Sequence, residues 1–167
     1  MSLFDEEERS AEYERARKRA MYLLGSHDYS SCALRDKLLN NYSEETADRV
    51  IEDMTDYGFL NDGEYARKLA ASLIKRKKYG LYRARAEMKR KGVPEELIGE
   101  ALEEYERDDY IEQLKDLIRK KYSDRIIERD DRQKVIVALA RRGFGFSEIK
   151  EAMLEVLEEY EDEETEE

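Results

Sequence analysis

The amino-acid sequence predicts an all-α protein built from three tandem three-helix repeats of about 50 residues each. The first observation is composition: the 167 residues include one proline, and Ala, Leu, Glu, Lys and Arg, which favour helices, dominate. The second is spacing, because apolar residues follow the i, i+3, i+4, i+7 pattern of one helix face within residues 47–54, 98–105 and 149–156. The third is recurrence: each stripe lies 51 residues after the one before, which is typical of tandem supersecondary units.

Each repeat is expected to contain three helices, and residues typical of helix ends support this. Ser43, Pro94 and Ser147 each precede first-turn acids, where a capping hydroxyl or an N1 proline stabilises a helix start. Gly92 and Gly143 stand at helix C-termini that need a positive φ. The expected helices span residues 9–25, 31–40 and 44–57 in the first repeat, 62–78, 81–91 and 95–106 in the second, and 109–122, 131–142 and 147–160 in the third.

The third repeat departs from the regular spacing. Its first apolar stripe, at Leu117 and Ile118, lies 44 residues after the equivalent stripe of the second repeat instead of 51. This difference predicts a longer loop over residues 122–130. The run 135–137 has strand propensity, but its alignment with the second helices of the other repeats favours a helix.

The predicted repeats occupy residues 9–58, 59–107 and 108–160. An acidic N-terminal segment, residues 1–8, precedes them. An acidic tail, residues 161–167, follows them and is expected to be solvated and without regular structure, because it offers nothing to bury. The tail is suited either to solubility or to a more specific role, which is to shield the basic centre or to repel DNA.

Charge is distributed unevenly along the chain, although the formal net charge is −11. Residues 67–91 contain eleven Lys and Arg and a single acid, Glu87, whereas residues 151–167 contain ten acids and no base. The acidic total opposes binding to nucleic acid, since polyanions repel acidic surfaces. The basic second repeat is nevertheless suited to an anionic partner, which would offset the repulsion among its own cations.

Several functional classes find no support in the sequence. The longest apolar run, residues 135–140, is far shorter than the roughly 20 residues of a membrane-spanning helix, and the acidic opening is unlike a secretory signal, so a cytoplasmic protein without membrane contact is expected. Cys32 and His27 each stand alone, so no disulfide, metal site or cofactor is expected. No glycine-rich phosphate loop or Ser/His/Asp set appears, so an enzyme is not predicted. Nothing requires a dimer, and a monomer is expected.

Short motifs follow one another in the second and third repeats. They are YGFLND at residues 57–62, YA at 65–66, KKYG at 77–80, EMKRKGV at 87–93 and ARRGF at 140–144. In order and spacing these motifs resemble the RecX family of bacterial modulators of the RecA recombinase, over about residues 12–157. The first repeat departs from the family pattern at residues 27–28 and 40–41, where basic residues, with a glycine at the second site, are usual.

The resemblance implies a function that composition and spacing do not. It implies an elongated, curved array of three-helix repeats that lies in the helical groove of the RecA filament on single-stranded DNA. Such binding restrains strand exchange, ATP hydrolysis and coprotease activity of RecA during DNA repair. The expected partner is therefore the RecA filament, with single-stranded DNA contacted weakly or through RecA.

The candidate partner-binding residues lie mostly on the exposed faces of the second repeat. They are Arg67, Lys68, Lys75, Arg76, Lys77, Lys78, Tyr79, Tyr82, Arg83, Arg85, Lys89, Arg90 and Lys91, with Arg141 and Arg142 from the third repeat. Tyr79 and Tyr82 are suited to stacking on bases, to packing on RecA or to packing within the fold. Arg141 and Arg142 are equally suited to stabilising a helix C-terminus.

Two hypotheses about function remain. In the first, the repeats bind the RecA filament by shape and charge, with DNA as a weak secondary contact. In the second, the three-helix units bind DNA by themselves, as helix-turn-helix domains do. The acidic net charge favours the first hypothesis, because a protein that relied on phosphate contacts alone would gain from basic charge throughout.

Overall fold

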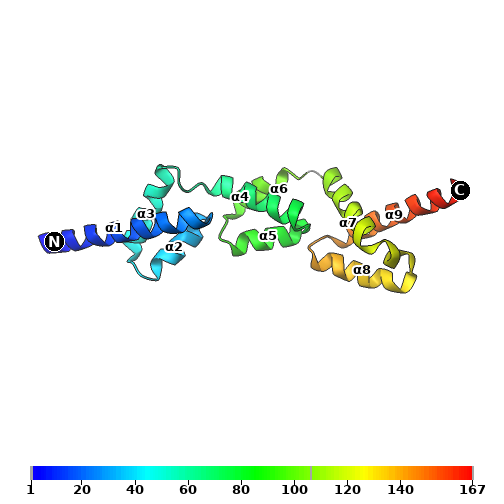
Figure 1. The fold of residues 1–167 in the computed structure, drawn as a ribbon, viewed down its shortest axis with the longest axis horizontal. Coiled ribbons are helices and arrows are strands. Elements are labelled where there is room, and N and C mark those ends of the chain that lie inside the picture. The colour runs from blue at the N-terminus through cyan, green and yellow to red at the C-terminus, as the bar shows by residue number, and fades with distance from the viewer. Residues whose placement is uncertain (1, 106, 167) are drawn as a thin grey trace. The chain divides into compact units, whose positions relative to one another are not determined.

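The protein is described by a computed structural model that covers residues 2–105 and 107–166. Within these residues the chain forms nine α-helices and no strand, which confirms the predicted all-α class (Figure 1). The helices are α1 (Leu3–Ser26), α2 (Ser31–Leu39), α3 (Glu44–Asp56), α4 (Asp62–Ala71) with its π-helical continuation η1 (Ser72–Arg76), α5 (Leu81–Arg90), α6 (Glu95–Glu103), α7 (Arg107–Ile127), α8 (Arg129–Arg141) and α9 (Phe146–Glu166). No helix among the described residues combines the length and apolar character that a membrane crossing requires.

The chain divides into two compact units. One comprises Met1–Lys68 and Met88–Ile98, and the other comprises Leu69–Glu87 and Gly99–Glu167. Each unit therefore contains one outer group of three helices and part of each of the middle helices α4, α5 and α6. The segment 135–137 lies in α8, so the helix favoured by the repeat alignment is confirmed.

The first unit has a core of small and branched side chains. Ala16 and Ala20 of α1 are fully buried and allow close packing against Leu34, Leu38 and Val50 of α2 and α3. Polar contacts between α1 and α3 fix the same helices, so the core is closed by both apolar packing and hydrogen bonds.

Ser43 caps α3, as predicted, because its hydroxyl accepts a hydrogen bond from the Thr46 N–H at 3.3 Å. The Glu12 carboxylate of α1 reaches this cap and accepts from the Ser43 N–H at 2.8 Å and from the Thr46 hydroxyl at 2.7 Å. These hydrogen bonds to the charged form lower the pKa of Glu12. The cap thereby joins α1 to α3.

Helix α1 begins earlier than the sequence predicts. Residues 3–8, expected to form an acidic segment outside the helices, form its first turns. Ser2 and Asp5 form a capping box, in which the Ser2 hydroxyl accepts from the Asp5 N–H and the Asp5 carboxylate accepts from the Ser2 N–H. The Ser2 N–H bond is the main reason that the pKa of Asp5 is lowered.

The predicted long loop over residues 122–130 is wrong. Helix α7 continues to Ile127, and only Glu128 separates it from α8. Ile126 is fully buried and extends the apolar stripe that contains Leu114 and Ile118, so the additional residues form further helical turns. Burial of Ile126 explains why helix is favoured here over loop.

The start of α9 also differs from the prediction. The Gly145 carbonyl accepts from the Ile149 N–H at 2.9 Å, and the Glu148 carboxylate accepts from the Gly145 N–H at 3.1 Å. Ser147 therefore lies within the first turn and is not the cap. At α6 the Pro94 carbonyl likewise accepts from the Ile98 N–H, which places Pro94 just before the helix instead of at N1.

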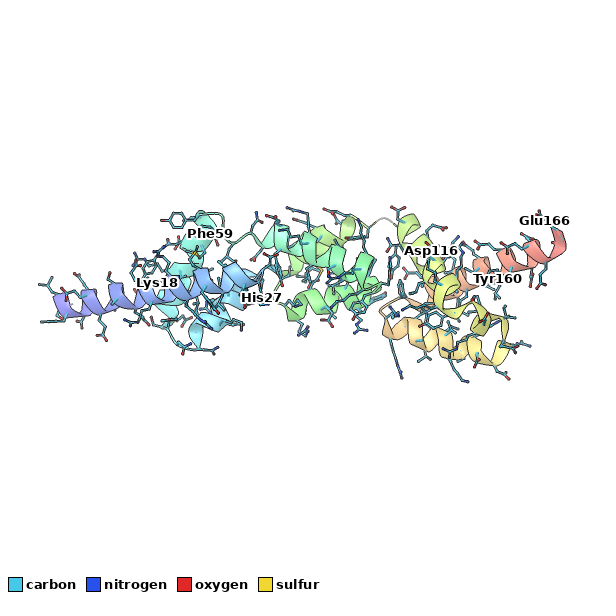
Figure 2. The ribbon with its side chains drawn as sticks, viewed as in Figure 1. Lys18, His27, Phe59, Asp116, Tyr160 and Glu166 are labelled. Atoms are coloured by element: carbon cyan, nitrogen blue, oxygen red, sulfur yellow. The ribbon has the colours of Figure 1, made fainter. Side chains whose placement is uncertain are left out.

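The acidic tail is helical, contrary to the prediction. Helix α9 continues through residues 161–166, which are exposed, and Figure 2 shows Glu166 at the end of this projecting helix; residue 167 lies outside the described residues. Ion pairs between α7 and α9 add to the apolar packing that holds α9 in place. Lys115 is nearly buried and its ammonium donates to Glu112 at 2.6 Å and to Glu155 at 2.8 Å, which raises the pKa of Lys115 to about 12.

Arg119 of α7 makes a bidentate contact with Glu159 of α9. Its Nε and Nη2 atoms donate to the two carboxylate oxygens at 3.0 and 2.8 Å. This pairing is the main cause of the lowered pKa of Glu159. The contact lies just before the acidic tail and holds this part of α9 against α7.

Replacing Glu159 with glutamine is expected to lower the free energy of unfolding at pH 7 by about 0.5–1 kcal/mol, a small value because the pair is partly exposed. Since folding lowers the pKa of Glu159, this stabilisation is present above the ordinary pKa of 4.5 and is lost as the pH falls through the lowered folded-state value. Urea unfolding at pH 7 and pH 3 measures the difference, which should shrink at pH 3. The exposed neighbour Glu158→Gln is the control, and an equal loss for Glu159→Gln at both pH values would contradict the prediction.

Candidate partner-binding site

The start of α5 is joined to the end of α8 by backbone hydrogen bonds. The Gly80 N–H donates to the Arg142 carbonyl at 2.8 Å, and the Tyr82 N–H donates to the Gly143 carbonyl at 3.1 Å. Two amide groups at the start of α5, which have no partner within the helix, are thus satisfied by the third repeat. We call this contact the second junction.

Tyr110 of α7 satisfies a further amide at the same helix start. Its hydroxyl accepts from the Leu81 N–H at 3.2 Å, and its ring packs on Phe144 with centroids 5.4 Å apart. Burial raises the pKa of the Tyr110 hydroxyl above its usual range. Because these amide groups are occupied, the start of α5 does not offer them to an anion.

Two glycines make the second junction possible. A Cβ atom on Gly80 would lie 2.3 Å from the carbonyl carbon and oxygen of Gly143. A Cβ atom on Gly143 would lie 2.4 Å from the Arg83 nitrogen, and Gly143 has φ +99°. The predicted positive φ at Gly143 is confirmed, as it is at Gly92 with φ +81°.

An equivalent junction occurs in the first unit with different chemistry. The buried Ser30 hydroxyl donates to the Lys91 carbonyl at 2.7 Å and accepts from the Ala33 N–H at 3.1 Å. Ser30 lies 50 residues before Gly80, and Lys91 lies 51 residues before Arg142, so the two junctions occupy the same place in the repeat. A side-chain hydroxyl makes this first junction, where the second one uses direct backbone contact.

Four consecutive cations, Lys75–Lys78, precede the second junction. The first two end η1 and the other two follow it, and we call all four the cationic loop. All four side chains are exposed. Within residues 2–105 and 107–166 none of them forms an ion pair with a carboxylate. Their charge is therefore available to an anionic partner.

The backbone around the cationic loop is held in place from the third repeat. The Arg142 guanidinium donates to the Lys77 carbonyl at 3.3 Å, while the Arg142 carbonyl accepts from Gly80. Lys78 has φ 58°, a left-handed conformation that ends the helical segment after η1. Arg142 is half-buried, so its main contribution is to position the cationic loop.

Tyr79 and Tyr82 differ in their surroundings. The Arg83 guanidinium lies 3.9 Å from the centroid of the Tyr79 ring and the Lys77 ammonium lies 5.8 Å from it, and Tyr79 is half-buried. Of the roles predicted for Tyr79, the structure shows packing within the fold. Tyr82 is 72% exposed and remains open to a partner.

The other predicted residues divide between the two units. Lys68 in the first unit pairs with Glu64 at 3.0 Å, which raises the pKa of Lys68, so its charge is partly balanced. The remaining predicted cations of the first unit are exposed, and they are Arg67, Lys89, Arg90 and Lys91. In the second unit Arg83 is half-buried, whereas Arg85 and Arg141 are exposed. The structure thus brings the cationic loop, Tyr82, Arg83 and Arg142 together around the second junction.

Three residues at the second junction are absent from the sequence-based site. Gly80 and Tyr110 position the start of α5, and Phe146 is 59% exposed at the start of α9. The repeat alignment contains a signal for two of them, because Gly80 replaces the capping Ser30 and Phe146 replaces Glu95. Tyr110 has no such signal, since its role depends on a contact across 29 residues.

These features define a class of protein, an all-α chain of three-helix repeats that presents exposed cations beside a junction between repeats. Comparison with known families agrees with this class. Residues 16–54, 61–102 and 108–153 match the first, second and third three-helix domains of RecX, respectively. The chain belongs to the RecX family of regulatory proteins, and its members are not enzymes.

Individual relatives support this assignment. The chain is similar to the regulatory protein RecX of Prosthecochloris aestuarii, with 33% identity over 144 residues that cover 86% of this chain and 94% of the relative. RecX of Trichlorobacter lovleyi is 35% identical over 130 residues, which cover 75% of this chain and 84% of that relative. The crystal structure of RecX from Lactobacillus salivarius has the same fold, with a TM-score of 0.80 and 19% identity over 88% of this chain and 97% of that one.

Replacing Gly80 with alanine is expected to lower the free energy of unfolding by about 1–3 kcal/mol, because the new methyl group meets main-chain atoms of Gly143, which shift less readily than a flexible side chain. Gly99→Ala is the matched control. No atom lies within 4 Å of a Cβ there, and alanine favours the helix α6 by about 0.5–1 kcal/mol. Urea unfolding of both variants checks the prediction, and a Gly80→Ala protein as stable as the wild type would refute the close approach.

Proposed function

We propose that this RecX-family chain acts as a monomer on the RecA filament assembled on single-stranded DNA, and that it restrains ATP hydrolysis, strand exchange and coprotease activity of RecA. Membership of a family of regulatory proteins supports a regulatory role. The observation that carries the proposal is the cationic loop, whose four exposed charges have no carboxylate partner among the described residues. Such a surface is suited to an anionic patch on a partner.

The distribution of charge favours an assembled filament over DNA alone. The net charge of −11 opposes close approach to a polyanion over most of the chain. The helical acidic end of α9, residues 161–166, is exposed and would repel phosphates. A localised basic surface in an acidic protein therefore fits a partner that presents its own localised negative charge, with DNA as a secondary contact.

The candidate contacts follow the geometry of the second junction. We propose the cationic loop and Tyr82 as primary contacts, since they are exposed. Arg85 and Arg141 extend the same surface within the second unit. In the first unit the proposed contacts are Arg67, Lys68, Lys89, Arg90 and Lys91. Tyr79, Arg83 and Arg142 serve mainly to position the cationic loop.

The experiment that tests the proposal measures DNA-dependent ATP hydrolysis by RecA on single-stranded DNA with increasing amounts of this protein. Inhibition is expected with fewer protein molecules than RecA subunits, because one bound repeat array would restrain neighbouring subunits. Cosedimentation with RecA filaments measures binding in parallel. Unchanged ATP hydrolysis together with absent cosedimentation would reject the proposed function.

Changing Lys75, Arg76, Lys77 and Lys78 to glutamate is expected to raise the concentration for half-maximal inhibition by about tenfold or more, because attraction becomes repulsion at the contact. The ATP hydrolysis assay measures the shift. The matched control is Lys18, Lys120, Lys121 and Lys150 changed to glutamate, which alters the net charge equally. These four are also exposed and outside any ion pair among residues 2–105 and 107–166, and Figure 2 labels Lys18 on α1. Equal inhibition by the two variants, both folded by circular dichroism, would reject the cationic loop as the contact.

A further inference from the structure

Two exposed aromatic side chains lie at the second junction. Tyr82, in the first turn of α5, is 72% exposed, and Phe146, the first residue of α9, is 59% exposed. Large aromatic residues bury much area when they find a partner, so exposed rings are suited to binding where their surroundings also match a ligand.

The backbone of the junction places both residues together. The Tyr82 N–H donates to the Gly143 carbonyl at 3.1 Å, which holds the start of α5 against Gly143, two residues before Gly145. A Cβ atom on Gly145 would lie 3.6 Å from Cε2 of Tyr82, so the tyrosine ring lies against Gly145. Phe146 follows Gly145 directly, and the absence of a side chain on Gly145 leaves the tyrosine ring open beside it.

The equivalent junction in the first unit shows that the fold does not require these rings. By the repeat spacing, Cys32 stands 50 residues before Tyr82, and Glu95 stands 51 residues before Phe146. The first junction forms with these two residues and with a hydroxyl in place of the backbone contact. The two aromatic residues are therefore a special feature of the second junction.

Cations flank the two residues along the chain within the second unit. Arg141 is exposed at the end of α8, Arg83 follows Tyr82, and the cationic loop ends three residues before the start of α5. The nearby Glu148 carboxylate accepts a hydrogen bond from the Gly145 N–H, which holds it at the start of α9. Cations that hold phosphates beside aromatic faces on which bases stack are the combination used by proteins that bind single strands.

We infer that Tyr82 and Phe146 form a stacking platform for unpaired bases, so that this surface contacts single-stranded DNA directly. Paired bases are stacked within a duplex and do not present their faces to the platform. The contact therefore selects single strands. The choice of DNA rests on the proposed function, but the platform is tested without RecA, so each can fail independently of the other.

The test measures fluorescence anisotropy of a labelled 20-nucleotide polythymidine strand without RecA, at several salt concentrations. Tyr82→Ala and Phe146→Ala are each expected to weaken binding by about fivefold or more, the loss that removal of one stacking contact produces. The dependence on salt should stay the same, because no phosphate contact is removed. Tyr82→Phe and Phe146→Tyr should bind as the wild type does, since both keep an aromatic face.

Tyr57→Ala and Phe59→Ala are the matched controls. Both residues are exposed aromatics in the turn before α4, and Figure 2 labels Phe59 there. Neither control should change the affinity for the polythymidine strand. A labelled duplex should be bound equally by the wild type and by the alanine variants.

Three results would overturn the inference. The first is no binding of the strand by the wild type at low salt. The second is unchanged DNA affinity in the Tyr82→Ala and Phe146→Ala variants with an unchanged effect on RecA. The third is unchanged DNA affinity in these variants with loss of the effect on RecA, which would mean that the rings contact protein. Inhibition of RecA by the wild type would leave the proposed function standing in each case.

Discussion

Close approach of two backbones at the second junction is the constraint on which the candidate site depends. Gly80 and Gly143 are near enough that a single Cβ atom on either would meet the main chain of the other segment. This contact sets where α5 begins, lets the Arg142 guanidinium reach the Lys77 carbonyl, and exposes Tyr82 beside Phe146. The positions of the candidate side chains are thus consequences of a contact made by two residues that have no side chain.

The repeated architecture separates structural from functional requirements. Both junctions use the same positions, yet a serine hydroxyl makes one and backbone amides make the other. Because either chemistry joins the repeats, the surrounding surface is free to differ. The first junction has Cys32 and Glu95 at the equivalent repeat positions, whereas the second has two aromatic residues and is preceded by exposed cations. Specialisation of one junction is therefore compatible with a common scaffold.

The acidic net charge does not neutralise the cationic loop, because many carboxylates are held by cations of their own helices and neighbours. Arg35 pairs with Asp48 and Glu44 in the first unit, and Arg119 pairs with Glu159 in the second. Lys115 is enclosed by carboxylates of α7 and α9. These pairs contribute modestly to stability, but they hold negative charge in fixed places and leave Lys75–Lys78 without an ion pair within residues 2–105 and 107–166.

Sequence alone determined the features that depend on local pattern: the all-α class, the three helices per repeat, the positive φ of Gly92 and Gly143, and the basic middle repeat. These follow from periodicity and propensity, which act over a few residues. Tertiary structure decided what depends on distant partners. Burial of Ile126 turned an expected loop into helix, pairing of Arg119 with Glu159 across 40 residues supported a helical tail, and stacking of Arg83 covered Tyr79. Exposure of Phe146 was likewise decided by packing, because a side chain's surroundings are set by segments that the local pattern does not specify.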